Sequence, residues 1–139
     1  MKPVKIGFSL KVRIAISIIF GSLLLFAAVV SFFDIRAMLL VGVSAALWWR
    51  ILSLKVTFFP TEMIITGFFS QKRVNYRNAV GIEDGAKLIY LQAGRRKKAI
   101  IALALGYSTP DDRTPDGRMK REIISTFDDW KRGASSRPA

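Results

Sequence analysis

The chain has 139 residues, about one domain's worth, and combines 51% hydrophobic residues with a formal net charge of +12. It contains no Cys and no His, which excludes disulfides, thiolate metal sites and the commonest general base. The apolar and basic residues belong to different segments: residues 14–33 carry no charged side chain, and most Lys and Arg residues lie before residue 14 or after residue 49. This separation indicates a membrane protein with a basic part outside the bilayer.

The first predicted elements are a basic tail over residues 1–13 and a transmembrane helix over 14–33. At about 1.5 Å rise per residue, this run spans roughly the 30 Å hydrocarbon core of a bilayer. A cleaved signal peptide is the competing interpretation, because the tail is basic. We favour the helix, since the run exceeds the usual signal-peptide core of about 7–15 residues and a second apolar run follows at once.

A second span is predicted over 35–54, although its uncharged stretch covers only 37–49. Long arginine side chains at both ends can reach opposite interfaces, and the two tryptophans suit an interfacial aromatic belt. The predicted membrane-interface residues are Arg36, Trp48, Trp49, Arg50 and Lys55. Basic residues flank the pair of spans, so the positive-inside rule favours a hairpin in the inner (plasma) membrane with both termini cytoplasmic.

After residue 54 the pattern changes to short runs rich in Val, Ile, Phe, Tyr and Thr, which is typical of an antiparallel meander. We predict six strands, at 55–59, 62–69, 72–77, 79–83, 87–92 and 97–103. Asp84-Gly85 and Ala93-Gly94 are predicted turns between them. The strands belong to a predicted cytoplasmic domain over 55–132, a small sheet or partial barrel.

A C-terminal amphipathic helix is predicted over 115–132, because Thr114 and Pro115 suit the N-cap and first helical positions. Its apolar stripe consists of Met119, Ile123, Ile124, Phe127 and Trp130. We expect this stripe to pack on the sheet rather than on the membrane, since acidic residues on the polar face are unfavourable beside anionic lipid. Residues 133–139 are predicted to form a flexible tail.

This order of elements, with the stretch LKVTFFPTEMIITGFFSQKRVNYRNAVGIED, resembles small bacterial inner-membrane proteins that carry a pleckstrin-homology-like domain. The family's strand, second strand and basic strand match Val56–Phe58, Met63–Gly67 and Tyr76–Ile82. The resemblance implies a membrane α+β fold: a two-helix transmembrane hairpin, then a small antiparallel sheet or partial barrel with a capping helix. It also implies a binding or scaffolding role without enzymatic activity. A full pleckstrin-homology fold has seven strands, whereas six are predicted here.

No nucleophile motif, glycine-rich phosphate loop or metal-spaced cluster is present, so we predict no catalytic, cofactor or metal site. The candidate lipid- or partner-binding residues are the cations of two predicted hairpins: Lys72, Arg73, Arg77, Arg95, Arg96, Lys97 and Lys98. Anionic headgroups are the first expected partner, because each cation near the membrane surface contributes about 1 kcal/mol. The charges could instead serve only to block edge pairing and to fix topology.

A partner protein with an acidic patch, or a second copy of the chain, is the next expected partner. Nucleic acid ranks last, because no recognised binding motif accompanies the charge. We therefore expect a non-catalytic scaffold or regulatory module for a membrane-associated complex. A holin-like two-span protein and a membrane-tethered nucleic-acid binder are the alternatives. A holin-like tail would be short and polar, whereas this region has apolar strands that need a core.

Overall fold

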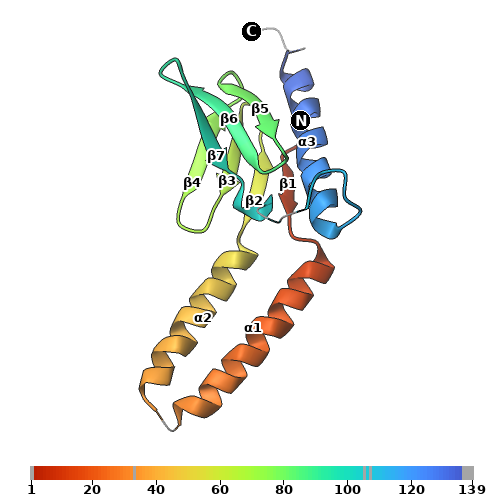
Figure 1. Ribbon diagram of the computed structural model, residues 1–139. Helices are drawn as coiled ribbons and strands as arrows, with labels where there is room; N and C mark the ends of the chain where they lie inside the picture. The colour runs from red at the N-terminus through yellow and green to blue at the C-terminus, as the bar shows by residue number, and fades with distance from the viewer. Residues whose placement is uncertain (1, 33, 105, 107, 136–139) are drawn as a thin grey trace. The chain divides into compact units, whose positions relative to one another are not determined.

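A computed structural model describes residues 2–32, 34–104, 106 and 108–135, apart from the side chains of residues 31, 37, 134 and 135 (Figure 1). The fold is α+β and divides into two units. A helix pair covers residues 8–54, and a sheet domain combines the residues before it with those from Lys55 onward. The sheet domain is therefore interrupted in sequence by the helix pair.

The helix pair consists of α1 (Leu10–Ser31) and α2 (Arg36–Leu52), which pack against each other. The Arg13 guanidinium donates to the Leu52 carbonyl at 3.4 Å, so the start of α1 lies beside the end of α2 and the helices are antiparallel. The helix begins before the predicted residue 14 because the Ser9 side chain accepts a hydrogen bond from the Val12 amide and caps it.

Most large side chains of these helices point outward. Ile19, Leu25 and Leu39 are 66%, 71% and 74% exposed, as expected for surfaces that face lipid. By length and composition α1 can cross a membrane, and an N-terminal signal sequence would share these properties. The apolar part of α2, Met38–Leu52, is shorter than a usual span, so the predicted second span over 35–54 is not supported by length.

The sheet domain contains two antiparallel sheets. One has the strand order β1-β2-β3-β4, with β1 (Val4–Gly7), β2 (Lys55–Phe58), β3 (Glu62–Thr66) and β4 (Gln71–Asn75). The other has the order β5-β6-β7, with β5 (Ala79–Glu83), β6 (Lys87–Gln92) and β7 (Arg95–Ile100).

The strand β1 lies within the basic tail predicted over 1–13, where no strand was predicted. Val4 pairs with Phe58 and Gly7 with Lys55, so β1 is the edge neighbour of β2. Ile6 is buried while Lys5 and Gly7 are exposed, which is the alternation of a half-buried strand. The described residues thus form seven strands, one more than predicted.

Four of the six predicted strands end earlier than expected, at Phe58, Thr66, Asn75 and Ile100, and the two largest differences have a clear local form. The predicted strand 62–69 stops at Thr66, because the Gly67 amide donates to the Ser70 carbonyl and reverses the chain. The predicted strand 97–103 starts and ends early, as Arg95–Ile100, and the chain then forms a short 3₁₀ helix, η1 (Ala102–Ala104). The predicted turns at 84–85 and 93–94 are confirmed, with positive φ at all four residues, as a type I′ hairpin turn requires.

The C-terminal helix α3 (Pro115–Ser135) runs beside both sheets and contacts β1 and β5 (Figure 1). Ile123, Phe127 and Trp130 are buried, and the Trp130 indole N–H donates to the Phe59 carbonyl at 2.6 Å. The predictions of a Thr114 cap and of packing on the sheet are therefore confirmed. The helix continues through Ser135, three residues into the tail predicted over 133–139, and residues 136–139 lie outside the described ones.

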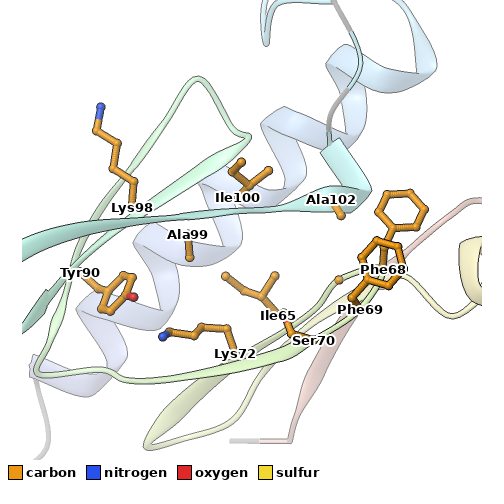
Figure 2. A pocket seen from close by; sticks show the side chains of 11 residues that line it. Ile65, Phe68, Phe69, Ser70, Lys72, Tyr90, Lys98, Ala99, Ile100 and Ala102 are labelled. Carbon is orange, nitrogen blue, oxygen red and sulfur yellow. The ribbon is translucent and has the colours of Figure 1, made fainter.

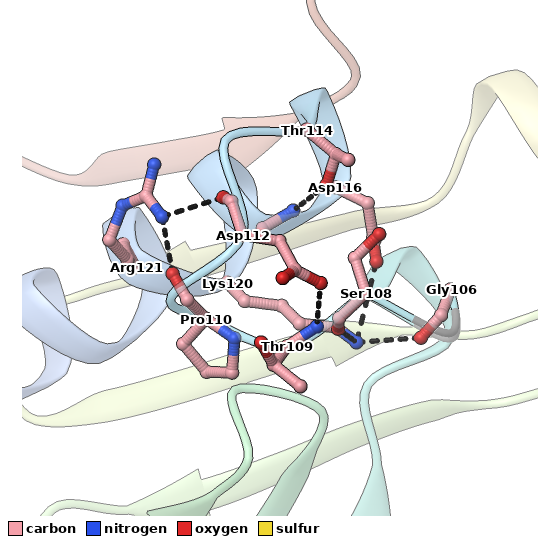
Figure 3. A network of polar contacts seen from close by, with 10 residues as sticks. Gly106, Ser108, Thr109, Pro110, Asp112, Thr114, Asp116, Lys120 and Arg121 are labelled. Atoms are coloured by element: carbon pink, nitrogen blue, oxygen red, sulfur yellow. Dashed lines mark hydrogen bonds and ion pairs between the residues drawn. The ribbon is translucent and has the colours of Figure 1, made fainter.

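Lys120 joins α3 to the segment that precedes it (Figure 3). Its side chain is buried, and the ammonium donates to the carbonyls of Gly106 and Ser108 at 2.6 and 2.5 Å. Asp116 lies 3.4 Å away and balances the charge. A buried cation is stable only with such partners, so Lys120 fixes this connection against the helix.

Replacing Lys120 by Met should lower the free energy of unfolding of the sheet domain by about 2–3 kcal/mol, because charge-assisted hydrogen bonds to two carbonyls are lost. Arg121→Met is the matched control, since its exposed guanidinium donates to the carbonyls of Pro110 and Asp112. Urea unfolding of the full chain in detergent, followed by Trp130 fluorescence in a Trp48→Phe, Trp49→Phe background, measures both. Equal losses in the two variants would contradict the role assigned to Lys120.

Candidate binding surface

Each sheet ends in an open edge strand. Within the described residues, β4 pairs only with β3, and β7 pairs only with β6. In an antiparallel pair, successive residues direct their backbone N–H and C=O groups alternately toward and away from the partner strand. The hydrogen bond from the Gly67 amide to the Ser70 carbonyl sets this alternation for β4, so the backbone groups of Gln71, Arg73 and Asn75 point away from β3. The Ile101 amide donates to the Ala86 carbonyl and sets the same alternation for β7. The outward backbone groups of β7 are therefore those of Arg96, Lys98 and Ile100.

A groove of about 500 Å³ runs between these edges (Figure 2). Its walls come from β3, from the β3–β4 turn, and from β4, β6, β7 and η1. Lys72 lies across the groove, with its ammonium 5.2 Å from the centre of the Tyr90 ring. Tyr90 is buried, so this cation–π contact links β4 of one sheet to β6 of the other.

The structure places six of the seven predicted cations on the two open edges. Lys72 and Arg73 belong to β4, and residues 95–98 lie along β7 rather than at the hairpin tip, which is Ala93-Gly94. Arg77 follows β4 and stands apart from the groove. Its Nε donates to the hydroxyl of Tyr76 at 3.3 Å, which raises the pKa of the Arg77 guanidinium.

Lys98 is already paired. Its ammonium lies 2.7 Å from the Glu83 carboxylate, so it ties β7 to β5 across the outer face of β6. The Lys98 hydrogen bond, and then the Lys98 charge, hold the pKa of Glu83 below its usual value, and Lys87 adds to this. Sequence reasoning gave all four cations of residues 95–98 the same standing, whereas the structure separates Lys98 from the other three.

The predicted membrane-interface residues fall in different units. Arg36 and Arg50 lie near opposite ends of α2, as a pair flanking a span would. Trp49 is 74% exposed, whereas the indole nitrogen of Trp48 is buried without a hydrogen-bond partner among the described residues. Lys55 is the first residue of β2 and belongs to the sheet domain.

Sequence reasoning missed Tyr90, Glu83 and the two phenylalanines of the β3–β4 turn as parts of this surface. Tyr90 lies two residues after buried Leu88 on β6, so both side chains share the inward face of the strand, and this spacing is a signal that sequence reasoning could have used. Within the described part of the chain, no three Asp or Glu side chains lie together in a way that could hold a metal ion.

No protein-family model matches the chain, and no curated protein or solved structure is significantly similar to it. We therefore infer function from the geometry of the edges and the groove.

Replacing Lys98 by Gln should return the pKa of Glu83 toward the ordinary glutamate value of about 4.3. A carboxyl whose pKa is lower in the folded state stabilises the fold above its unfolded pKa. The wild-type chain should therefore lose this contribution as the pH falls below about 4, whereas the variant keeps only the small part that Lys87 supplies. The effect on stability is small because both groups are exposed.

A ¹³C NMR titration of the Glu83 carboxyl measures the shift directly. Lys97→Gln is the matched control: Lys97 neighbours Lys98 but pairs with Tyr90 and points to the other face of β7. An unchanged Glu83 pKa in Lys98→Gln would show that the ion pair does not form in solution.

Proposed function

We propose that the chain is a two-span inner-membrane protein whose cytoplasmic sheet domain is a non-catalytic binding module for a membrane-associated protein complex. The topology is supported by the pairing of β1 with β2. Gly7 and Lys55 are register partners in one sheet, and the helix pair lies between them in the chain. Strands of one sheet share one side of a membrane, so this segment crosses it an even number of times. If α1 crosses, α2 returns.

The length of α2 is compatible with this topology. Its 17 residues rise about 25 Å, somewhat less than a hydrocarbon core. Local thinning of the bilayer and snorkelling of the flanking Arg36 and Arg50 accommodate a mismatch of this size. The basic residues on both sides of the helix pair then favour the cytoplasm for the sheet domain.

The single observation that carries the binding role is the groove between two open edges that both bear cations. An extended segment of a partner can add its backbone to an unpaired edge, and such β-augmentation uses the outward amides and carbonyls described above. Arg73 on β4 and Arg96 and Lys97 on β7 then favour an acidic segment. The partner that fits is an acidic, extended stretch of protein.

The remaining alternatives receive less support. Val56, Met63 and Leu88 are fully buried in the sheet domain, and such a core is more than a holin-like tail needs.

The seven strands and the terminal helix of the described residues agree with the number of elements in a full pleckstrin-homology fold, which supports the resemblance proposed from sequence.

The topology predicts opposite results for two reporter insertions. A fluorescent protein fused after residue 139 should fluoresce, and alkaline phosphatase fused there should be inactive, because this end is cytoplasmic. Alkaline phosphatase inserted between Asp34 and Ile35, in the turn between the helices, should be active. Active phosphatase at residue 139 would refute the two-span topology.

The partner is tested by photocrosslinking in cells, with p-benzoylphenylalanine placed at Arg73 and, as a control, at exposed Glu122 on α3. Residue 73 should crosslink to a polypeptide, and mass spectrometry should map the link to an acidic segment. Arg96→Glu should reduce the yield several-fold, whereas Arg118→Glu on α3 makes the same change in net charge and should not. Links only to lipid or to nucleic acid would overturn the protein-binding role.

A further inference from the structure

The β3–β4 turn, residues 67–70, lies at a particular end of its sheet. Gly7 pairs with Lys55, Lys55 with Thr66, and Thr66 with Gln71, so these residues form one row across β1 to β4. The row marks the sheet end at which the chain leaves for the helix pair and returns from it. The turn begins directly beyond this row.

The turn presents an aromatic ring that the sheet domain does not cover. Phe69 is 95% exposed, the largest exposed fraction of any large apolar side chain described in this domain. Phe68 and Phe69 lie beside Ala102 at one end of the groove, which Ile100 also lines (Figure 2). Ile100 is itself 58% exposed, so the apolar surface extends from the turn to the end of β7.

A cation borders this apolar end. Lys55 is exposed at the start of β2, in the row that borders the turn. An exposed aromatic ring beside a cation has the composition of a surface that meets anionic headgroups, where rings enter the interface and cations pair with phosphates.

Short connections limit how far this sheet end can lie from the helix ends. Only Phe8 and Ser9 separate β1 from α1, and only Ser53 and Leu54 separate α2 from β2. A chain advances at most about 3.3–3.6 Å per residue, so each connection covers roughly 10 Å. Helices that span a bilayer would therefore hold this end of the sheet close to its surface.

We propose that the turn Gly67–Ser70 with Ile100 is a membrane anchor. Phe69 inserts between the headgroups of the protein's own bilayer, and Lys55 lies against anionic phosphates. This proposal rests on the proposed membrane insertion of the helix pair. It adds a contact that holds the sheet domain in a fixed orientation, separate from the partner edges farther along the groove.

Depth measurement by electron paramagnetic resonance tests the anchor. The chain has no cysteine, so Ser70→Cys carries a single nitroxide and keeps both phenylalanines. Thr61→Cys is the matched control, exposed in the β2–β3 turn at the opposite sheet end. The full chain is placed in vesicles of phosphatidylcholine and phosphatidylglycerol. The label at 70 should be several-fold less accessible to a water-soluble nickel chelate than the label at 61, and more accessible to oxygen.

Adding Phe69→Ser to Ser70→Cys should restore most of the chelate accessibility, because the inserted ring is lost. Equal accessibility at 70 and 61, or shielding at 70 that Phe69→Ser leaves unchanged, would overturn the anchor. The two proposals fail separately: reporter fusions count the membrane crossings and crosslinking identifies the partner, whereas the nitroxide reports only whether residue 70 lies against lipid.

Discussion

The pairing of Val4–Gly7 with Lys55–Phe58 is the constraint on which the rest of the structure depends. It closes the chain around the helix pair, and the entropic cost of such a closure grows only slowly with loop length. The antiparallel packing of α1 and α2 lowers this cost further, because it already brings the two chain ends together. β1 in turn gives α3 a contact surface, so the sheet and the terminal helix support each other.

Two open edges beside each other are an aggregation hazard that this domain controls with charge. Lys72 points inward over Tyr90, and an inward cation on an edge strand discourages pairing with another strand. The exposed arginines repel the same edges of a second copy. The groups that prevent self-association are also those that would admit an acidic strand, because such a strand neutralises them. In the proposed function, protection and recognition would therefore use the same residues, and the sign of the partner's charge would decide between them.

Local signals in the sequence were sufficient for α3, its Thr114 cap and the hairpin turns, because each depends on neighbours within a few residues. The strand β1 could not be predicted, since four residues carry little signal and their partner lies beyond two helices. Burial of Lys120 was equally hidden, because its partner carbonyls come from a loop. The cations of the binding surface were found from composition, but their division between two edges, and the pairing of Lys98 with Glu83, follow only from strand register.

The two ends of the groove differ in chemistry, and they correspond to the proposed membrane anchor and the proposed partner edges. The Phe68 and Phe69 end is apolar, and toward Gln92 a smaller pocket continues the groove, lined by Lys72, Arg73 and Gln92. If the apolar end lies in the bilayer interface, an occupant of the groove leaves the membrane surface there and meets cations farther out. A segment with apolar residues first and acidic residues next satisfies both ends. Under the proposed function and the proposed anchor, this order matches that of a chain emerging from the same membrane.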